Sequence, residues 1–175
     1  MKKIFTWVSW VAAVGLVIAW PAKIGLAADK VSYSGKYSSN RPTIKSGVET
    51  DSTLEVVQNE NSLEVTRVEL GKRTTSHCPF NGPEGDYTSP GGVSGKCKAQ
   101  LKAKYLVLES VVVGRPQSTA PPIRMRTKER WQLSADGKSL TIKSDVDFPD
   151  FPADISAAVA GDTSGTRKYT RIGNP

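Results

Sequence analysis

The chain has 175 residues, which suits a single domain large enough to bury an apolar core without the help of metals. Its formal net charge is +7, of which three positive charges belong to the N-terminal leader described next. The mild excess that remains does not indicate nucleic acid as a partner. The sequence has one histidine and therefore no histidine pair, which argues against catalytic zinc.

Residues 1–27 have the three-part layout of a secretory signal peptide. A positive start precedes an uncharged apolar run over residues 4–20, and small residues at Gly25 and Ala27 suit cleavage after Ala27. The run of 17 residues falls short of the ~20 that span a membrane comfortably, so a retained anchor is the weaker alternative. We therefore predict a mature domain over residues 28–175 that is periplasmic or secreted.

Period-two alternation of apolar and polar residues predicts strands along the mature chain. The first clear run covers residues 53–58, and residues 63–70 form the next strand. The apolar phase slips by one residue at Arg67–Val68, which predicts a β-bulge there. Residues 71–92 are rich in Gly, Pro and Ser and are expected to form a loop.

Two cysteines, Cys78 and Cys97, flank most of this expected loop. An even number of cysteines in an exported chain favours a disulfide between them, with two free thiols as the alternative. In the chain-entropy model, closing a loop of this size contributes ~3 kcal/mol to stability.

Further strands follow the loop. Residues 93–101 alternate small or apolar side chains with polar ones, and a turn is expected at Lys102–Lys104. Tyr105–Val113 is the most hydrophobic run of the mature chain, and its β-branched content suits a strand that is buried on both faces or nearly so.

The clearest strand is predicted over Ile123–Leu133, and the Asp136–Gly137 pair after it is the strongest hairpin signal in the sequence. Strict alternation gives this strand an apolar face and a basic face. The apolar face carries Ile123, Met125, Thr127, Glu129, Trp131 and Leu133, and the basic face carries Arg124, Arg126, Lys128, Arg130 and Gln132.

The return strand of that hairpin alternates through Leu140, Ile142, Ser144 and Val146. A short helical turn is expected at residues 155–160, and residues 166–172 form a closing strand. These elements indicate an all-β fold of seven or more antiparallel strands in sequence order. Such a meander is best closed into a barrel, with a two-sheet sandwich as the alternative.

Two short patches resemble lipocalin-like, or calycin-like, proteins. Val31–Tyr37 is similar to the first strand of lipocalin-like barrels, where a glycine followed by a basic and an aromatic residue enters the base of the barrel. Tyr37 stands where that motif most often has Trp. Trp131–Leu140 resembles a pattern in small exported bacterial proteins of the same shape, many of them uncharacterised. The resemblance implies a barrel and carries over no binding residue.

A carboxylate on the apolar face, Glu129, is the most informative polar residue, because burying it is costly unless it is paired. Three explanations are open for this residue. It forms an ion pair with an inward residue such as Arg67 or Arg171, it lies at an edge open to water, or it holds the polar end of a ligand. For the last case we take Glu129, Trp131 and Tyr105 as the candidate ligand-binding residues.

A basic stripe is expected on the outer side of the sheet, formed by Arg124, Arg126, Lys128, Arg130, Lys96 and Lys98. The simplest interpretation is an ordinary solvated face. Nucleic-acid platforms interleave exposed aromatic residues for stacking, and this stripe has none, which argues against nucleic acid. An anionic envelope polymer or a lipid head group is the better candidate partner.

No catalytic constellation is found. The only histidine, His77, is expected on an exposed loop. The Gly137–Ser139 segment lacks the first glycine of a phosphate-binding loop and lies in a hairpin. The aspartates of residues 145–154 lack the spacing of a calcium loop. We predict no catalytic residue, no metal and no cofactor.

Two functional hypotheses remain. The first is a non-catalytic barrel that binds a small apolar or amphipathic molecule in its mouth. The second is an envelope or adhesion module that docks through the basic stripe. An open barrel interior favours the first hypothesis, and a filled interior favours the second.

Overall fold

The computed structural model describes residues 31–39, 43–45, 48–50, 52–69, 71–89, 91–115, 121–154, 156–157 and 164–174. They belong to one compact unit, Val31–Pro175. The signal peptide expected over residues 1–27 lies outside the described residues. Within the described part of the chain, no helix has the length and hydropathy needed to cross a membrane.

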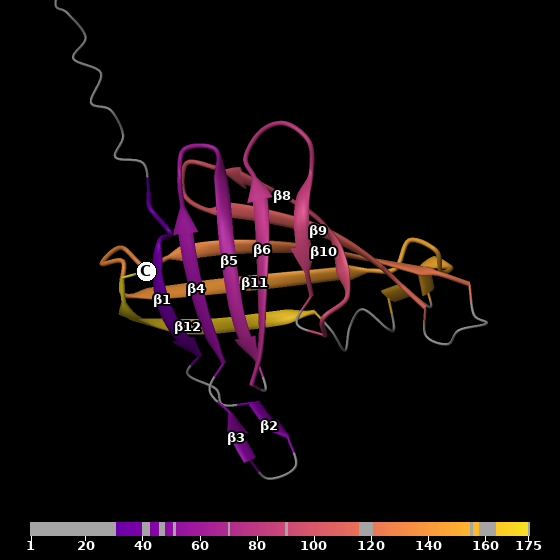
Figure 1. Ribbon diagram of the computed structural model, residues 1–175, viewed down its shortest axis with the longest axis horizontal. Helices are drawn as coiled ribbons and strands as arrows, with labels where there is room; N and C mark the ends of the chain where they lie inside the picture. Colours follow the sequence, from indigo (N-terminus) through magenta and orange to yellow (C-terminus); the bar gives the residue numbers. More distant parts are fainter. Residues whose placement is uncertain are drawn as a thin grey trace, which may run out of the picture. The chain divides into compact units, whose positions relative to one another are not determined.

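The described residues are mostly strands. In chain order these are β1 (Gly35–Ser39), β2 (Thr43–Lys45), β3 (Val48–Thr50), β4 (Thr53–Gln58), β5 (Ser62–Glu69), β6 (Lys72–Pro79), β7 (Gly85–Thr88), β8 (Ser94–Leu101), β9 (Leu106–Gly114), β10 (Ile123–Leu133), β11 (Ser139–Asp147) and β12 (Gly165–Gly173). The hairpin of β2 and β3 is a separate two-stranded sheet inserted between β1 and β4 (Figure 1).

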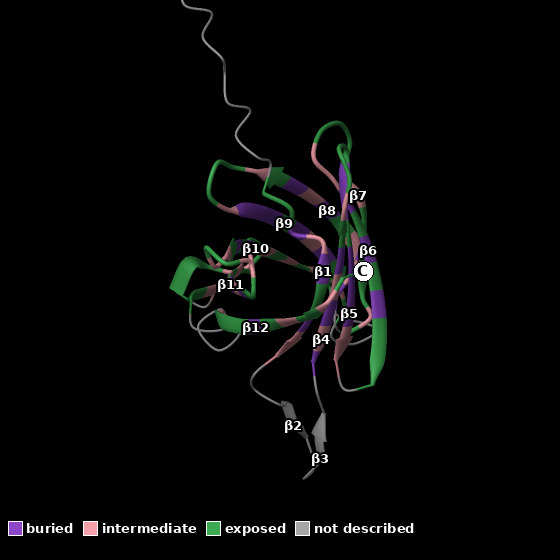
Figure 2. Cartoon of the chain, turned by 90° about the vertical axis from the view of Figure 1, so that its left-hand side faces the viewer, coloured by how far each residue is buried: buried purple, intermediate pink, exposed green. Residues whose placement is uncertain are grey.

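The other strands form a single antiparallel sheet in the order β6-β5-β4-β1-β12-β11-β10-β9-β8-β7. Neighbours in this sheet follow one another along the chain, and β1 pairs with β12, so the meander curls into a ring. Figure 2 shows the strands curving from β1 through β12 and β11 to β9 and β8, with β4, β5 and β6 on the other side. The predicted antiparallel meander closing into a barrel is confirmed, and the sandwich alternative is wrong.

The ring has a seam where β6 faces β7, because these two strands end the hydrogen-bonded sheet. Side chains close the seam: the Ser76 hydroxyl accepts a hydrogen bond from the Thr88 amide at 3.0 Å. A Cβ built on Gly85 would come within 2.0 Å of the His77 carbonyl oxygen, so only glycine allows this close approach. The strands of the seam are thus held by side chains and close packing instead of a backbone ladder.

The loop predicted for residues 71–92 is wrong, since most of this range forms β6 and β7. The inward positions of β6 are Thr74, Ser76 and Cys78, which are buried but small and mostly polar. The apolar alternation that reveals other strands is therefore missing here. His77 is exposed as expected, but it lies on β6 and not on a loop.

The β-bulge predicted at Arg67–Val68 is also wrong. The pairing of β5 with β4 and with β6 runs without a shift through both residues. Arg67 is an inward-facing residue that is 9% exposed, so a charged side chain occupies a position where an apolar one was expected. This produces an apparent phase slip. The register shift that does occur lies between Lys36 and Tyr37, where β1 pairs with β12.

Only one face of β9 is fully buried, contrary to the prediction for Tyr105–Val113. Leu106 and Leu108 point inward and are buried, whereas Glu109 is exposed and Val113 is 53% exposed on the outer face. A barrel is a single layer with solvent outside, which explains the difference. The expected helical turn starts earlier than predicted, at residues 153–154, and residues 155 and 158–160 of it lie outside the described residues.

The hairpin of β10 and β11 matches its prediction closely. β10 has the predicted bounds and the predicted alternation, with the four basic residues exposed and Trp131 buried. Gly137 in the turn has a φ of +67°, a conformation that glycine adopts at little cost. The return strand buries Leu140 and Ile142, and the closing strand buries Tyr169, as expected.

One half of the barrel interior is filled by apolar and aromatic side chains, including Leu54, Val56, Leu63, Leu106, Trp131 and Leu140. Two buried tyrosines of the N-terminal patch complete this core. The Tyr33 hydroxyl donates to the Trp131 carbonyl at 3.2 Å, and the Tyr37 hydroxyl donates to the Tyr33 carbonyl at 2.8 Å. Burial raises the pKa of Tyr33 to about 12.

The predicted disulfide between Cys78 and Cys97 is present and joins β6 to β8, with the two Cα atoms 5.2 Å apart. Replacing both cysteines with alanine should lower the free energy of unfolding by ~3 kcal/mol, since the closed loop restricts the unfolded chain. Urea unfolding of the parent and the double variant measures this difference. Labelling of thiols in denatured, unreduced parent protein should give no signal, and two labelled cysteines would show that the bond is absent.

Candidate functional site: a cavity above a buried ion pair

The other half of the barrel interior contains a cavity of about 370 Å³. This volume lies within the range of ~300–1,000 Å³ that is typical of small-molecule sites. Strands β10, β11 and β12 supply most of the wall. The lining residues are Arg67, Tyr87, Met125, Thr127, Glu129, Ile142, Ser144, Val146, Ser164, Gly165, Thr166, Arg167 and Tyr169.

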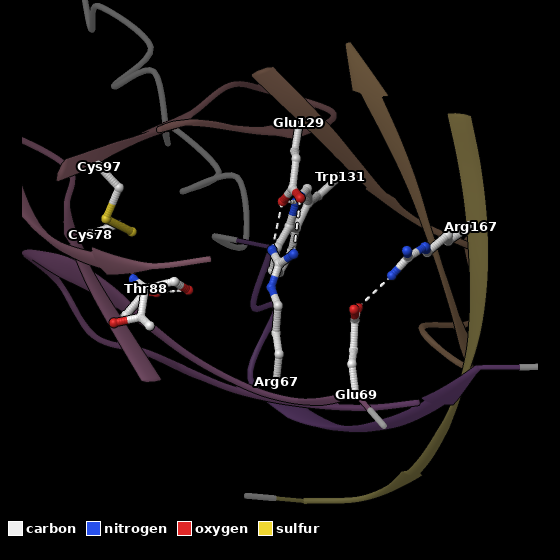
Figure 3. Close-up of polar contacts among 9 residues, drawn as sticks. Arg67, Glu69, Cys78, Thr88, Cys97, Glu129, Trp131 and Arg167 are labelled. Atoms are coloured by element: carbon white, nitrogen blue, oxygen red, sulfur yellow. Dashed lines mark hydrogen bonds and ion pairs between the residues drawn. A yellow bond between two sulfur atoms is a disulfide. The ribbon is translucent and has the colours of Figure 1, made fainter. Parts of the chain in front are cut away.

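The floor of the cavity is an ion pair between Arg67 of β5 and Glu129 of β10 (Figure 3). Arg67 Nη1 donates to Glu129 Oε1 at 3.0 Å, and Nη2 donates to Oε2 at 2.7 Å. The indole Nε1 of Trp131 donates to the same Oε2 at 2.8 Å. Of the alternatives for Glu129, the ion pair with Arg67 is therefore the one that forms. Arg171 instead donates to the Ser34 carbonyl and the Tyr37 hydroxyl.

Both members of the floor pair remain charged. Burial alone would raise the pKa of Glu129, but the charge and hydrogen bonds of Arg67, helped by the Trp131 N–H, hold that pKa below its ordinary value. Burial would lower the pKa of Arg67, and Glu129 outweighs this effect and raises it. The bidentate geometry satisfies two donors and both oxygens at once, which fixes the two side chains against each other.

A second ion pair lies beside the first, where Arg167 of β12 donates to Glu69 of β5. Figure 3 shows Arg67 and Glu69 rising from the same strand to meet Glu129 and Arg167. Burial acts to lower the pKa of Arg167, and the neighbouring Glu69 and the hydroxyl of Tyr169 raise it overall. The Arg167 side chain is 56% exposed, whereas the Glu69 side chain is 16% exposed, so this pair is more open to solvent than the floor.

The cavity wall is polar on some strands and apolar on others. Met125, Ile142 and Val146 give apolar surface from β10 and β11. Tyr87 of β7 and Tyr169 of β12 add aromatic rings with hydroxyl groups. Burial raises the pKa of Tyr87, so its hydroxyl stays protonated at neutral pH. The arrangement can therefore accept an apolar body and hydrogen-bond a polar group.

The three predicted ligand-binding residues have different positions. Glu129 lines the cavity floor. Trp131 is fully buried in the core and supports Glu129 from the side through its N–H. Tyr105 does not line the cavity, since its ring packs under the guanidinium of Arg130, 4.6 Å from the ring centroid, and Arg130 faces outward.

Sequence reasoning missed Arg167, Glu69 and Tyr87 as interior residues, and it placed Arg67 only as a partner of Glu129. A signal for Arg67 was present, since it lies in phase with Leu63 and Val65, which point inward. The other three have polar groups at inward positions, and alternation of polarity cannot reveal them.

The predicted basic stripe is exposed except at Lys98, which is half-buried, but acidic residues neutralise most of it. Ion pairs join Arg124 to Asp150, Arg126 to Asp147, Lys128 to Glu109 and Lys96 to Asp86. Lys98 lies opposite Glu109 in the β8–β9 register. Asp147 at the end of β11 and Asp150 after it thus serve as partners of the stripe. Among the described residues, no group of three or more acidic, histidine or cysteine side chains could hold a metal ion.

A ten-stranded antiparallel meander in which β1 pairs with β12 is a nearly closed, all-antiparallel β-barrel, and this is the class of fold to which the described residues belong. No protein-family model and no curated protein sequence matches the chain. Among solved structures, the chain is similar to zebrafish ileal bile acid-binding protein complexed with cholic acid. The TM-score is 0.46 and the identity 16%, over 81% of this chain and 97% of that chain. At this identity the likeness concerns the path of the chain, and no side-chain contact is carried across.

Proposed function

We propose that this protein is a non-catalytic β-barrel that binds a small amphipathic molecule inside its open half. The observation that carries the proposal is the cavity of about 370 Å³, which has partly apolar walls and an ion-paired floor. Apolar surface that lines a cavity gains free energy when a ligand displaces water from it. A ligand with an apolar body and a polar group matches both parts of this lining.

The packed half of the barrel limits how far a ligand can enter. Below the floor, Trp131 and Leu140 are fully buried and leave the interior filled. The floor pair is held by Arg67, Glu129 and Trp131 together, so it forms a rigid boundary. A ligand is therefore confined to the half lined by Met125 and Val146.

Binding is favoured over catalysis by the state of the interior acids. A general acid or base needs a pKa near the working pH. The pKa of Glu129 is instead lowered by Arg67, and both carboxylate oxygens are already hydrogen-bonded. Glu129 is thus suited to orient neighbouring groups and not to exchange protons.

We also propose that the protein acts outside the cytoplasm. The leader pattern of residues 1–27 and the disulfide between Cys78 and Cys97 support this proposal, since structural disulfides persist in oxidising compartments. Mass analysis of the protein from its own host checks it: the chain is expected to begin at Ala28 or Asp29. An intact N-terminal methionine would contradict export by cleavage.

A cavity-filling variant tests the binding function. Ser144 points into the cavity from β11, so Ser144→Phe should fill part of the space and lower ligand occupancy. Lys143→Phe, one residue earlier and exposed, is the matched control and should keep the occupancy of the parent. Native mass spectrometry of each protein, purified from the host, measures occupancy by a co-purified small molecule.

The expected result is a bound mass in the parent and in Lys143→Phe, reduced about tenfold or more in Ser144→Phe, as expected when a ring occupies the ligand volume. If the parent carries no small molecule and also binds no added amphipath in calorimetry, the proposed function is wrong. Equal occupancy in the parent and in Ser144→Phe would place the ligand elsewhere on the protein.

A further inference from the structure

The charges inside the barrel are balanced, and this bears on which ligand the cavity accepts. The described residues that line or border it include two guanidinium groups, Arg67 and Arg167, and two carboxylates, Glu129 and Glu69. Each guanidinium is paired with a carboxylate. The other lining residues are uncharged at neutral pH. Arg67, Arg167 and Glu129 line the cavity and Glu69 adjoins it as the partner of Arg167, so the charges of the two ion pairs sum to zero.

An anionic ligand would meet this arrangement unfavourably. Both Nη atoms of Arg67 are already bonded to Glu129, and Arg167 is held by Glu69. A ligand carboxylate could take both Nη groups of Arg67 only by displacing Glu129, which would leave a buried carboxylate beside a second negative charge, and this is costly. The more exposed Arg167 has further N–H groups, but a ligand carboxylate bound to them would lie beside the negative charge of Glu69.

A cationic ligand is also disfavoured, because each carboxylate is already paired with an arginine and the ligand would lie beside that positive charge. An uncharged polar group displaces neither partner. It can form hydrogen bonds with the N–H groups at the exposed end of Arg167 and with the hydroxyls of Thr127 and Ser144, which line the same cavity. Such bonds to a charged donor are stronger than those between neutral groups.

We propose that the ligand of this cavity is a net-neutral amphipath, with an amide, ester or hydroxyl head and an apolar chain, and that the Glu69–Arg167 pair selects against charged heads. This inference rests on the proposed binding function. Glu69 and Arg167 are the specificity-determining residues, because Arg167 lines the cavity with its side chain 56% exposed and Glu69 is its partner, so this pair is more accessible to a head group than the floor pair.

Two nearly isosteric probes test the inference. Decanamide and decanoate have the same shape and differ in charge at pH 7. Isothermal titration calorimetry of the full parent chain should give tighter binding of decanamide than of decanoate, by about tenfold, because the charged head of decanoate would lie beside Glu69 or displace Glu129 and the amide would do neither. If neither probe binds, the proposed function fails. If decanoate binds as tightly as decanamide or more tightly, binding is upheld and the selection for neutral ligands is wrong.

Glu69→Gln frees Arg167 and should shift the preference toward decanoate, so that the affinity ratio falls to about one or inverts. Glu109→Gln removes a carboxylate from the outer face, where Glu109 pairs with Lys128, and should leave the parental ratio. The two variants change the net charge equally. An equal change of the ratio in both would mean that overall charge controls binding, and this would overturn the role of Glu69.

Arg167→Gln gives the reciprocal test. It leaves Glu69 without its arginine, so decylammonium should gain affinity relative to decanamide in this variant. Circular dichroism establishes whether each variant is folded. If one of the variants Glu69→Gln and Arg167→Gln misfolds, the other still tests the inference. A gain of decanoate affinity in Arg167→Gln would contradict the inference.

Discussion

Replacing Glu129 with glutamine should lower the free energy of unfolding by ~3–5 kcal/mol, the usual effect of removing one partner from a buried ion pair. The Arg67 and Glu129 side chains are 11% and 6% exposed, so water cannot solvate the positive charge that is left on Arg67. The substituted amide would still accept one hydrogen bond, but the guanidinium of Arg67 would remain buried without a counter-charge. Urea unfolding followed by tryptophan fluorescence measures the loss.

Glu109→Gln is the matched control on the outer face. Its partner Lys128 lies at 2.9 Å, but both side chains are about half exposed, so the expected loss is under ~1 kcal/mol. Equal losses in the two variants would show that the floor pair is no more important than a surface pair. Replacing both floor residues, as Arg67→Met with Glu129→Leu, should recover much of the stability, because apolar pairs of similar volume often substitute for buried ion pairs.

The same pair makes stability depend on pH. Because the pKa of Glu129 is lower in the folded protein than in the unfolded chain, its contribution is present above the unfolded value of ~4.3 and is lost as the pH falls through the folded value. The parent should therefore lose stability in acid more steeply than Glu129→Gln, and urea unfolding of both proteins over a series of acidic pH values measures the difference.

Trp131→Ala should lower the free energy of unfolding by ~3–5 kcal/mol, the range for a large aromatic residue removed from a core. Trp131 is fully buried among the apolar residues of the filled half, and its N–H holds Glu129. The change therefore creates a void and also removes a donor from the floor carboxylate. Thermal unfolding, read by far-UV circular dichroism, measures the effect.

Gln132→Ala is the control for this change, since Gln132 is the next residue of β10 and is exposed on the outer face. It should cost less than ~0.5 kcal/mol, as surface substitutions usually do. A large loss for Gln132→Ala with a small one for Trp131→Ala would mean that β10 presents the opposite face to the core.

The fold class could be predicted because the alternation of apolar and polar side chains is clear along the longest strand. Ile123–Leu133 has the predicted bounds, since basic residues mark one face and apolar residues the other along its whole length. The same reasoning failed for β6, whose inward residues are Thr74, Ser76 and Cys78. Small polar side chains can fill a position where the strands approach closely, and they give no apolar signal.

The site could be predicted only in part, because its chemistry depends on pairs that are distant in sequence. Arg67 and Glu129 are 62 residues apart, and Glu69 and Arg167 are 98 apart. Their contact depends on the barrel register, which sequence pattern alone does not define. The odd position of Glu129 could be recognised as one requiring a partner, and Arg67 was one of two candidates. Nothing in the pattern indicated that Arg167 faces the interior.

The seam between β6 and β7 has a consequence for self-association. Strands that end a sheet present unpaired backbone groups to other chains and are common starting points for aggregation. Here the two end strands face each other, held by Ser76 with Thr88 and by the disulfide to β8, so each shields the other. Lys72 and Pro79, at the two ends of β6, are of the kinds that discourage pairing with a further strand. The place where the backbone ring is incomplete is thus also the place where the molecule is protected against growing into a larger sheet.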